Sequence, residues 1–281
     1  MSQEMGRSEK RRRNRKIRTR VGFGMLAAVS LAAVLYSGAQ LLGYYKDYQR
    51  EMALEEELLQ MRKDAEGPAV TAKADADAEE TGFENTPVEK TTEQLRSFYH
   101  MMKEKNEDYV CWITLEGAGV DYPVVKRDNS FYLSHDFAGE PNRHGAVFLD
   151  QNCQADSDVL LLHAHHMKDG TMFGGLKKFK DREFCEENRE IVLEFEEKYE
   201  RYRVFAAAQV DLTAEGSFAF EMIPETAEEK TLYIEGLNRT SFWYDESVIG
   251  KNAENACIVI LSTCDYGTDD ERLLVAAKKI E

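Results

Sequence analysis

Cysteine is scarce in this sequence, with five residues in a chain of 281, and the spacing of the five is irregular. Small secreted domains that depend on disulfides are dense in cysteine, so this chain is not built on a disulfide framework. An odd number also leaves at least one thiol unpaired. Most of the five are expected to be small buried apolar residues, and one of them could instead be a nucleophile.

Charged residues are absent from residues 21–45, an uncharged run of 25. With a rise of about 1.5 Å per residue, a helix of this length spans a hydrocarbon core of roughly 30 Å. The apolar region of a cleaved signal peptide is shorter, about 7 to 15 residues, so a retained membrane anchor is favoured. Nine Lys and Arg residues in the preceding segment, 1–20, predict a cytoplasmic N-terminus and an extracellular body.

Basic residues are outnumbered by acidic ones after residue 45. From Lys46 onward the chain has 27 basic and 50 acidic residues, a net charge of −23. Such a surface repels phosphate backbones, so nucleic acid is not expected as a partner. Residues 46–90 begin with a stretch rich in Leu, Glu and Lys, typical of a juxtamembrane helix, and continue with a small, acidic stretch that predicts a flexible linker.

Large apolar residues return after residue 90. Residues 91–106 place Leu95, Phe98, Tyr99 and Met102 at helical spacing behind a threonine cap, which predicts a helix. Short runs rich in β-branched and aromatic residues follow, and they cover 110–117, 120–125, 145–150, 159–166, 190–196, 200–210, 256–263 and 272–280. Eight such runs predict a mainly β domain, either a closed barrel or a sandwich, with helical insertions at 175–190 and 225–240.

Two segments contain residues suited to covalent chemistry. Cys264 ends one apolar run, Arg272 opens the next, and His165 follows a third. A free thiol has a pKa near about 8.5 and is mostly protonated at neutral pH, but a neighbouring cation raises its ionised fraction. A histidine can then protonate a leaving amine, and an arginine can stabilise the oxyanion that forms on attack. This combination favours a cysteine nucleophile.

Other interpretations stay open on these residues alone. Taken singly, Cys264 is more often a core residue and Arg272 a surface partner of Asp270. His163 and His165 would share one face of a strand, because side chains alternate, and such a pair can bind zinc in a hydrolase. No H-E-x-x-H motif or other ligand spacing is present, so no metal is predicted. An anchored, acidic, all-β exodomain could also be a non-enzymatic binding module.

Several motifs in a fixed order resemble the class B sortases, which are membrane-anchored cysteine transpeptidases of Gram-positive bacteria. Their strand ending in Leu-Ser-Thr-Cys is matched by residues 261–264, and the arginine that opens their next strand is matched by Arg272. Their Met-Lys-Asp-Gly-Thr-Met-Phe loop is matched by 167–173. The likeness covers about residues 90–281 and continues upstream through Trp112, 121–125, 128–133 and 145–150.

The resemblance implies a role for specific residues of this sequence. Cys264 would be the nucleophile, His165 the general acid and base, and Arg272 the group that stabilises the oxyanion. Contacts with the substrate would come from Asn129, Leu133, Ser262 and Asp265. The sequence departs from the family pattern at three positions: Ala164 replaces a glycine before the catalytic histidine, His163 stands where tyrosine is common, and Cys111 replaces a glycine before Trp112.

The resemblance also implies a fold and a reaction. The fold would be a closed, eight-stranded, mostly antiparallel β-barrel with peripheral helices over residues 91–281, preceded by one transmembrane helix and a linker. The enzyme would cleave the C-terminal sorting signal of secreted proteins at a threonine carbonyl, through a thioacyl enzyme and without a cofactor. The acyl group would pass to an amine of a peptidoglycan precursor or, as the alternative, to a pilin subunit.

Overall fold

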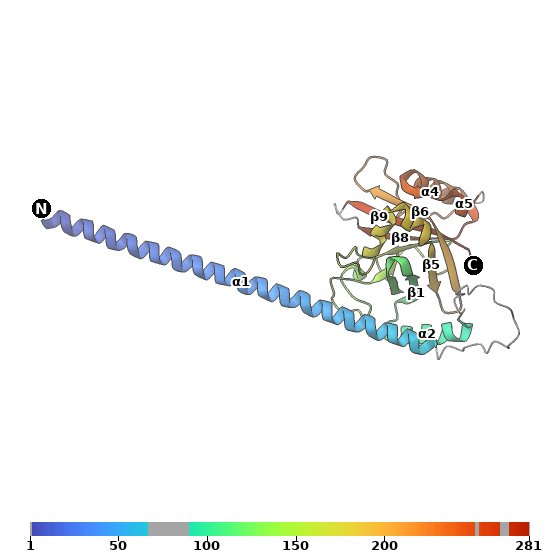
Figure 1. Ribbon diagram of the computed structural model, residues 1–281, viewed down its shortest axis with the longest axis horizontal. Coiled ribbons are helices and arrows are strands. Elements are labelled where there is room, and N and C mark those ends of the chain that lie inside the picture. Colours follow the sequence, from blue (N-terminus) through green and yellow to red (C-terminus); the bar gives the residue numbers. More distant parts are fainter. Residues whose placement is uncertain (1, 67–89, 251–252, 265–269, 281) are drawn as a thin grey trace. The chain divides into compact units, whose positions relative to one another are not determined.

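The structure is a computed structural model, and it describes residues 2–66, 90–250, 253–264 and 270–280; residues 2–24, 26, 27, 66 and 264 are described by their backbone alone. The chain divides into two compact units, Met1–Ala53 and Leu54–Glu281. The described part of the first unit is helical, whereas the second contains the whole sheet (Figure 1).

Helix α1 (Ser2–Glu66) includes the segment predicted to span a membrane, residues 21–45. Among the residues that the structure describes, no helix is both long enough and apolar enough to cross a membrane. The predicted span is therefore unconfirmed, and its residues 21–24, 26 and 27 are described by backbone alone. Residues 46–66 are helical, as predicted for a juxtamembrane segment. The predicted linker after them lies outside the described residues up to position 89.

Helix α2 (Thr92–Lys105) confirms the helix predicted at the start of the β-rich region. Thr91 caps it by accepting a hydrogen bond from the Gln94 backbone, while the Gln94 side chain accepts one from the Thr91 N–H. This reciprocal capping box satisfies two backbone donors that a helix start leaves unpaired. On the predicted apolar face, Leu95, Phe98 and Met102 are buried, whereas Tyr99 is half-buried.

Within the described ranges, nine strands form one sheet. They are β1 (Tyr109–Leu115), β2 (Val120–Val125), β3 (Val147–Leu149), β4 (Val159–His163), β5 (Glu190–Glu194), β6 (Tyr199–Asp211), β7 (Ser241–Tyr244), β8 (Ile258–Cys264) and β9 (Glu271–Lys279). Each of the eight predicted runs overlaps one strand, with ends that differ by a few residues. The sequence did not predict β7, a four-residue strand that directly follows a helix.

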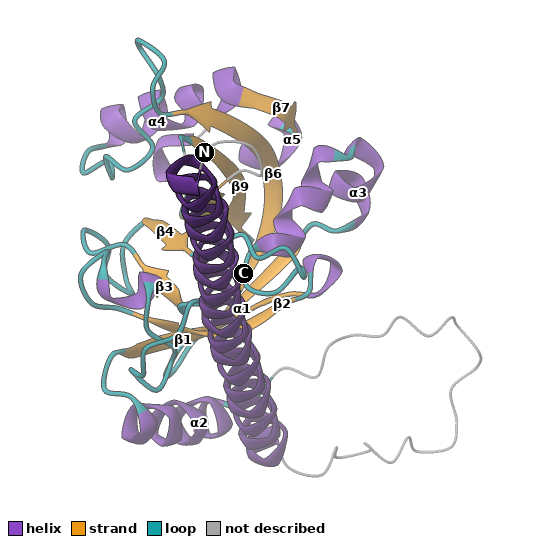
Figure 2. Ribbon diagram, turned by 90° about the vertical axis from the view of Figure 1, so that its left-hand side faces the viewer, coloured by secondary structure: helices purple, strands orange, loops and turns teal. Residues whose placement is uncertain are grey.

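The sheet closes into a barrel. Its strand order is β5-β1-β2-β3-β4-β8-β9-β6-β7, and a further pairing of β5 with β6 closes eight strands on themselves while β7 extends from β6 (Figure 2). Only β2–β3 and β4–β8 are parallel among the strand pairs of the described residues. The predicted closed, mostly antiparallel eight-stranded barrel is therefore confirmed.

Helices and turns lie around the barrel. Helix α4 (Ala227–Thr240) and helix α5 (Glu246–Ile249) contact β6, and α2 contacts β1. The insertion predicted as helical at 175–190 is instead a 3₁₀ segment, η3 (Gly174–Lys180), followed by the short helix α3 (Arg182–Glu187). Asp181 separates the two because its side chain caps the start of α3. The remaining 3₁₀ turns are η1 (Glu116–Ala118), η2 (Phe131–Leu133) and η4 (Ala253–Asn255).

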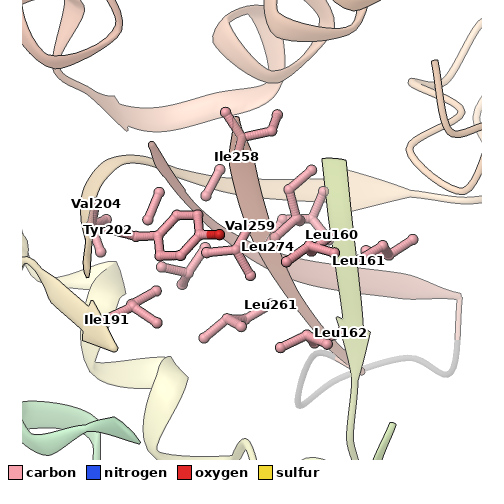
Figure 3. Close-up of a cluster of buried hydrophobic side chains, with 14 of the residues drawn as sticks. Leu160, Leu161, Leu162, Ile191, Tyr202, Val204, Ile258, Val259, Leu261 and Leu274 are labelled. Carbon is pink, nitrogen blue, oxygen red and sulfur yellow. The ribbon is translucent and has the colours of Figure 1, made fainter. Parts of the chain in front are cut away.

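Buried apolar side chains of the main core line the neighbouring strands β4 and β8. Figure 3 shows Leu160 to Leu162 of β4 beside Ile258, Val259 and Leu261 of β8, and all of these side chains are at most 3% exposed. Both faces of these strands are covered, so apolar residues follow one another instead of alternating with polar ones. The result is a rigid base for the polar residues at which the two strands end.

Residues 54–66, the part of α1 that belongs to the second unit, pack on the barrel. Leu58 is buried there in a cluster that includes Trp112. The Arg62 guanidinium lies 5.0 Å from the centroid of the Trp112 ring and forms ion pairs with Asp121 and Glu194. Glu194 is buried, so this pairing supplies the charge that its carboxylate needs.

Candidate active site

Two parallel strands bring the predicted catalytic residues to one edge of the barrel. The β4–β8 ladder ends with His163 paired to Ser262, and the Ala164 N–H donates to the Ser262 carbonyl over 3.3 Å. His165 comes two residues after His163, and Cys264 comes two residues after Ser262. The backbone of both strands thus carries the predicted histidine and the predicted nucleophile to the same edge.

Arg272 reaches this edge from the neighbouring strand. In the antiparallel β8–β9 ladder, Cys264 pairs directly with Arg272. The Arg272 side chain is half-buried, and its Nη1 donates to the Glu271 carbonyl over 3.3 Å. The structure therefore places the three predicted catalytic residues on adjoining strand ends.

A backbone carbonyl orients His165. The half-buried ring has its Nε2 atom 2.6 Å from the carbonyl oxygen of Leu133, in turn η2. A carbonyl oxygen only accepts hydrogen bonds, so Nε2 must carry the hydrogen. In the neutral ring Nδ1 is then the unprotonated nitrogen, which is the state a general base needs. The loop that carries Leu133 therefore sets the tautomer of the predicted acid and base.

Gly145 makes room for this arrangement. Its φ is +63°, in the left-handed region that favours glycine. A Cβ atom at this position would lie 2.4 Å from the Tyr132 carbonyl oxygen and 3.2 Å from Cδ2 of His165. Any larger residue would displace either the 131–133 turn or the imidazole ring.

The predicted substrate-binding residues have different surroundings. Leu133 is exposed and Asn129 is half-buried. Ser262 is only 2% exposed, and its Oγ has no hydrogen-bond partner among the described residues, as is also true of the neighbouring Thr263 hydroxyl. Asp265 lies outside the described residues. A buried hydroxyl without a partner is costly, so the Ser262 hydroxyl marks a place where a ligand could supply one.

His163 binds a buried carboxylate. Its Nε2 lies 3.1 Å from Oδ2 of Asp150, and the ring packs on Phe148 with a centroid distance of 5.2 Å. Burial alone would raise the pKa of Asp150, but hydrogen bonds from His163, the Asn152 N–H and Asn129 outweigh it and hold that pKa below its ordinary value. Asp150 is therefore ionised at neutral pH.

The other four cysteines are poor nucleophiles. Cys111, Cys153 and Cys185 are buried free thiols, and Cys257 is half-buried. Burial raises the pKa of Cys153 and that of Cys185 to about 11, and it raises the pKa values of Cys111 and Cys257 as well. All four stay protonated at neutral pH, and a protonated thiol attacks carbonyls poorly.

The two histidines behind the zinc hypothesis have separate partners. Nε2 of His163 contacts a carboxylate, whereas Nε2 of His165 contacts a backbone carbonyl. Within the described ranges, no group of three or more His, Cys, Asp and Glu residues is arranged to hold a metal ion.

Sequence reasoning gave no role to two residues that the structure places at this edge, Gly145 and Asp150. The run 145–150 predicts a strand and belongs to the family resemblance, but neither feature gives Gly145 or Asp150 a role of its own. The positive φ of Gly145 and the burial of Asp150 are properties of the folded chain.

Comparison with known proteins agrees with this geometry. A family model described as the sortase domain matches residues 113–280. The chain belongs to the sortase family. Sortase B of Listeria monocytogenes is 28% identical to this sortase over 193 residues, which are 66% of this chain and 76% of the relative.

Solved structures of class B sortases share the fold. Sortase B from Bacillus anthracis matches with a TM-score of 0.65 and 25% identity, over 84% of this chain and 99% of that one. A Streptococcus pyogenes class B sortase involved in pilus biogenesis matches with a TM-score of 0.56 and 28% identity, over 65% of this chain and 97% of that one. The resemblance to class B sortases is thus confirmed, and members of this family are cysteine transpeptidases.

Proposed function

We propose that this sortase is a cysteine transpeptidase that cleaves the C-terminal sorting signal of secreted proteins at a threonine carbonyl and transfers the acyl group to a cell-wall amine. The pairing of Cys264 with Arg272, at the edge where His165 follows β4, carries the proposal. It supplies a thiol, a cation and a titratable base on a rigid support, which is what acyl transfer through a thioester requires.

The first half of the reaction forms the acyl enzyme. The Cys264 thiolate attacks the threonine carbonyl carbon, and the carbonyl oxygen takes up negative charge that the Arg272 guanidinium stabilises. The intermediate collapses with cleavage of the C–N bond. His165 in its imidazolium form donates a proton to the departing amine, which leaves a thioester on Cys264 and a neutral imidazole.

The second half releases the product. An acceptor amine attacks the thioester carbonyl, and Nδ1 of His165 takes the proton that the amine loses. Cleavage of the C–S bond regenerates the thiolate and forms a new amide. No electrons are gained or lost overall, and the sequence of steps uses no cofactor.

The acceptor has two candidates. The primary one is an amine of a peptidoglycan precursor. The second is an amine of a pilin subunit, which is favoured by the similarity to the Streptococcus pyogenes class B sortase involved in pilus biogenesis. Parallel reactions with a wall-type diamino stem peptide and with a lysine-bearing pilin segment would rank the two by the yield of the coupled product.

We also propose that residues 21–45 attach the enzyme to the cell membrane, with the N-terminus in the cytoplasm and the catalytic domain outside. The support is the uncharged run itself and the nine basic residues that precede it. The full chain should remain in the membrane pellet after alkaline washing, while a chain that begins at Leu54 should appear in the supernatant. Equal release of both chains would contradict membrane attachment.

The activity test uses the full chain in detergent and a panel of quenched fluorescent peptides that resemble sorting signals. Cleavage should require Cys264, stop with a thiol alkylator, continue in the presence of a chelator, and give an amine-coupled product when an acceptor is added. Loss of activity with the chelator would instead support the zinc hydrolase. Binding of a peptide without any cleavage would support the non-enzymatic binding module.

A further inference from the structure

Asp150 is the centre of a buried hydrogen-bond network beside the proposed active site. It follows β3, and the residue is 1% exposed. Its Oδ1 accepts from the Asn152 N–H over 2.8 Å, and its Oδ2 lies 2.8 Å from Nδ2 of Asn129 and 3.1 Å from Nε2 of His163. One carboxylate therefore joins the loop before η2 to the end of β4.

The network fixes the orientation of the Asn129 amide. Nδ2 faces the Asp150 carboxylate, and Oδ1 accepts from the Gln151 N–H over 2.8 Å. A carboxylate only accepts and a backbone N–H only donates, so the amide fits in one orientation. The Asn129 amide has two N–H groups and uses one of them here. The second makes no hydrogen bond with the described residues.

The same carboxylate fixes the His163 ring. Because Oδ2 of Asp150 only accepts, Nε2 of His163 carries the hydrogen of that contact. In the neutral ring Nδ1 is then an acceptor, and it has no hydrogen bond with the described part of the chain. In the β4–β8 ladder His163 lies beside Ser262, whose buried hydroxyl lacks a partner among the described residues. Paired residues of parallel strands point to the same face of a sheet.

We propose that Asp150 is a positioning residue for the substrate: it orients Asn129 and His163 so that their remaining polar groups, together with the Ser262 hydroxyl, bind the backbone of an extended peptide. This inference rests on the proposed transpeptidase function. An extended peptide offers alternating C=O and N–H groups. The Asn129 N–H can donate to the former, His163 Nδ1 can accept from the latter, and a hydroxyl can do either.

The test substitutes Asp150→Asn, which keeps the shape of the side chain. An asparagine has one oxygen, so it must turn an NH₂ group either toward the Asn152 N–H or toward the donors of Asn129 and His163. We expect KM for the sorting-type peptide to rise about tenfold, the size of one hydrogen bond, with kcat within about twofold of the parent enzyme. Asp156→Asn, at an exposed residue of the following loop, is the matched control and should leave KM unchanged.

Two further measurements separate positioning from general destabilisation. The rate of alkylation of Cys264 by a small thiol reagent should be the same in Asp150→Asn and in the parent, because that reagent does not use the peptide site. The double variant Asp150→Asn/His163→Phe should have a KM no larger than that of the weaker-binding single variant, since Asp150 acts through its neighbours. An unchanged KM in Asp150→Asn, or a KM that rises only together with a slower alkylation, would overturn the proposal.

A measurement of peptide binding without cleavage tests the role of Asp150 separately from the transpeptidase activity. A labelled peptide is titrated by fluorescence anisotropy into Cys264→Ala and into Cys264→Ala/Asp150→Asn. We expect the second protein to bind about tenfold more weakly. If the parent enzyme fails to cleave the peptide but this difference persists, the transpeptidase fails and the positioning role stands. Equal affinity, or no binding by either protein, overturns the positioning role whatever the activity.

Discussion

At the scale of single residues, the tautomer of His165 follows from one contact, its 2.6 Å approach to the Leu133 carbonyl. The nitrogen left unprotonated is the one that can exchange a proton with an amine. We therefore expect His165→Ala to lower kcat by about 10²- to 10⁴-fold, the usual contribution of general acid and base catalysis. His166→Ala serves as the control and should lose less activity. The opposite ranking in a peptide cleavage assay would show that the proton passes through another residue.

Gly145 provides a second test at this scale. In Gly145→Ala the new methyl group would lie 2.4 Å from the Tyr132 carbonyl, and the backbone would keep its unfavourable positive φ. We expect the turn that holds His165 to shift and kcat to fall at least tenfold, with about 1 kcal/mol or more lost from the free energy of unfolding. Gly139→Ala is the matched control, because its φ is +77° but a Cβ atom there meets nothing within 4 Å. Equal activity of the two variants would contradict the steric role of Gly145.

At the scale of elements, the sequence predicted those parts whose signal is local. The sequence predicted β4 and β8 because each is a continuous apolar run. It predicted α2 because apolar residues recur at helical spacing along it. Strand β7 was not visible: it has four residues, and its pairing partner β6 ends 30 positions earlier. The 3₁₀ character of 174–180 was missed for a similar reason, since a basic, amphipathic stretch also fits an α-helix.

The packing of residues 54–66 on the barrel can be tested through Arg62. Glu194 is buried and forms ion pairs with Arg62 and Lys90. Without Arg62, Lys90 would be its remaining ion-pair partner among the described residues. We expect Arg62→Ala to cost about 3 kcal/mol of unfolding free energy, as for other broken buried ion pairs, measured by chemical denaturation. Arg96→Ala breaks an ion pair with Glu197 that is solvent-exposed on both sides and should leave stability unchanged. Similar losses in both variants would contradict a specific role for Arg62.

At the scale of the whole molecule, the five thiols should differ sharply in reactivity. A thiol with a pKa of about 11, such as Cys153 or Cys185, is ionised in only about one molecule in ten thousand at pH 7. Because a raised pKa moves ionisation to higher pH, the thiolate fraction of these residues increases with pH above neutrality. Their alkylation should become faster with each unit of pH. We expect one adduct per folded chain at pH 7, on Cys264, by intact and peptide mass spectrometry. A first adduct on any other cysteine would contradict this assignment.

The chemistry of the site could be predicted from the sequence more fully than its geometry. Cys264 ends an apolar run, His165 follows another, and Arg272 opens a third. Because these runs form strands, the strand order alone brings the three residues to one edge of the barrel. Asp150 could not be found in this way. Its importance depends on its burial and on its contacts with Asn129 and His163, which are 21 and 13 positions away in the sequence.

The most direct test of the central claim is to trap the acyl enzyme. The full chain is mixed with a sorting-type peptide, quenched in acid within the first turnovers, and digested for mass spectrometry. The prediction is a thioester that joins the threonine carbonyl of the peptide to Cys264, that disappears when an acceptor amine is added, and that is absent from Cys264→Ala. Peptide cleavage by Cys264→Ala at the parent rate, or cleavage without any adduct on Cys264, would contradict the proposed mechanism.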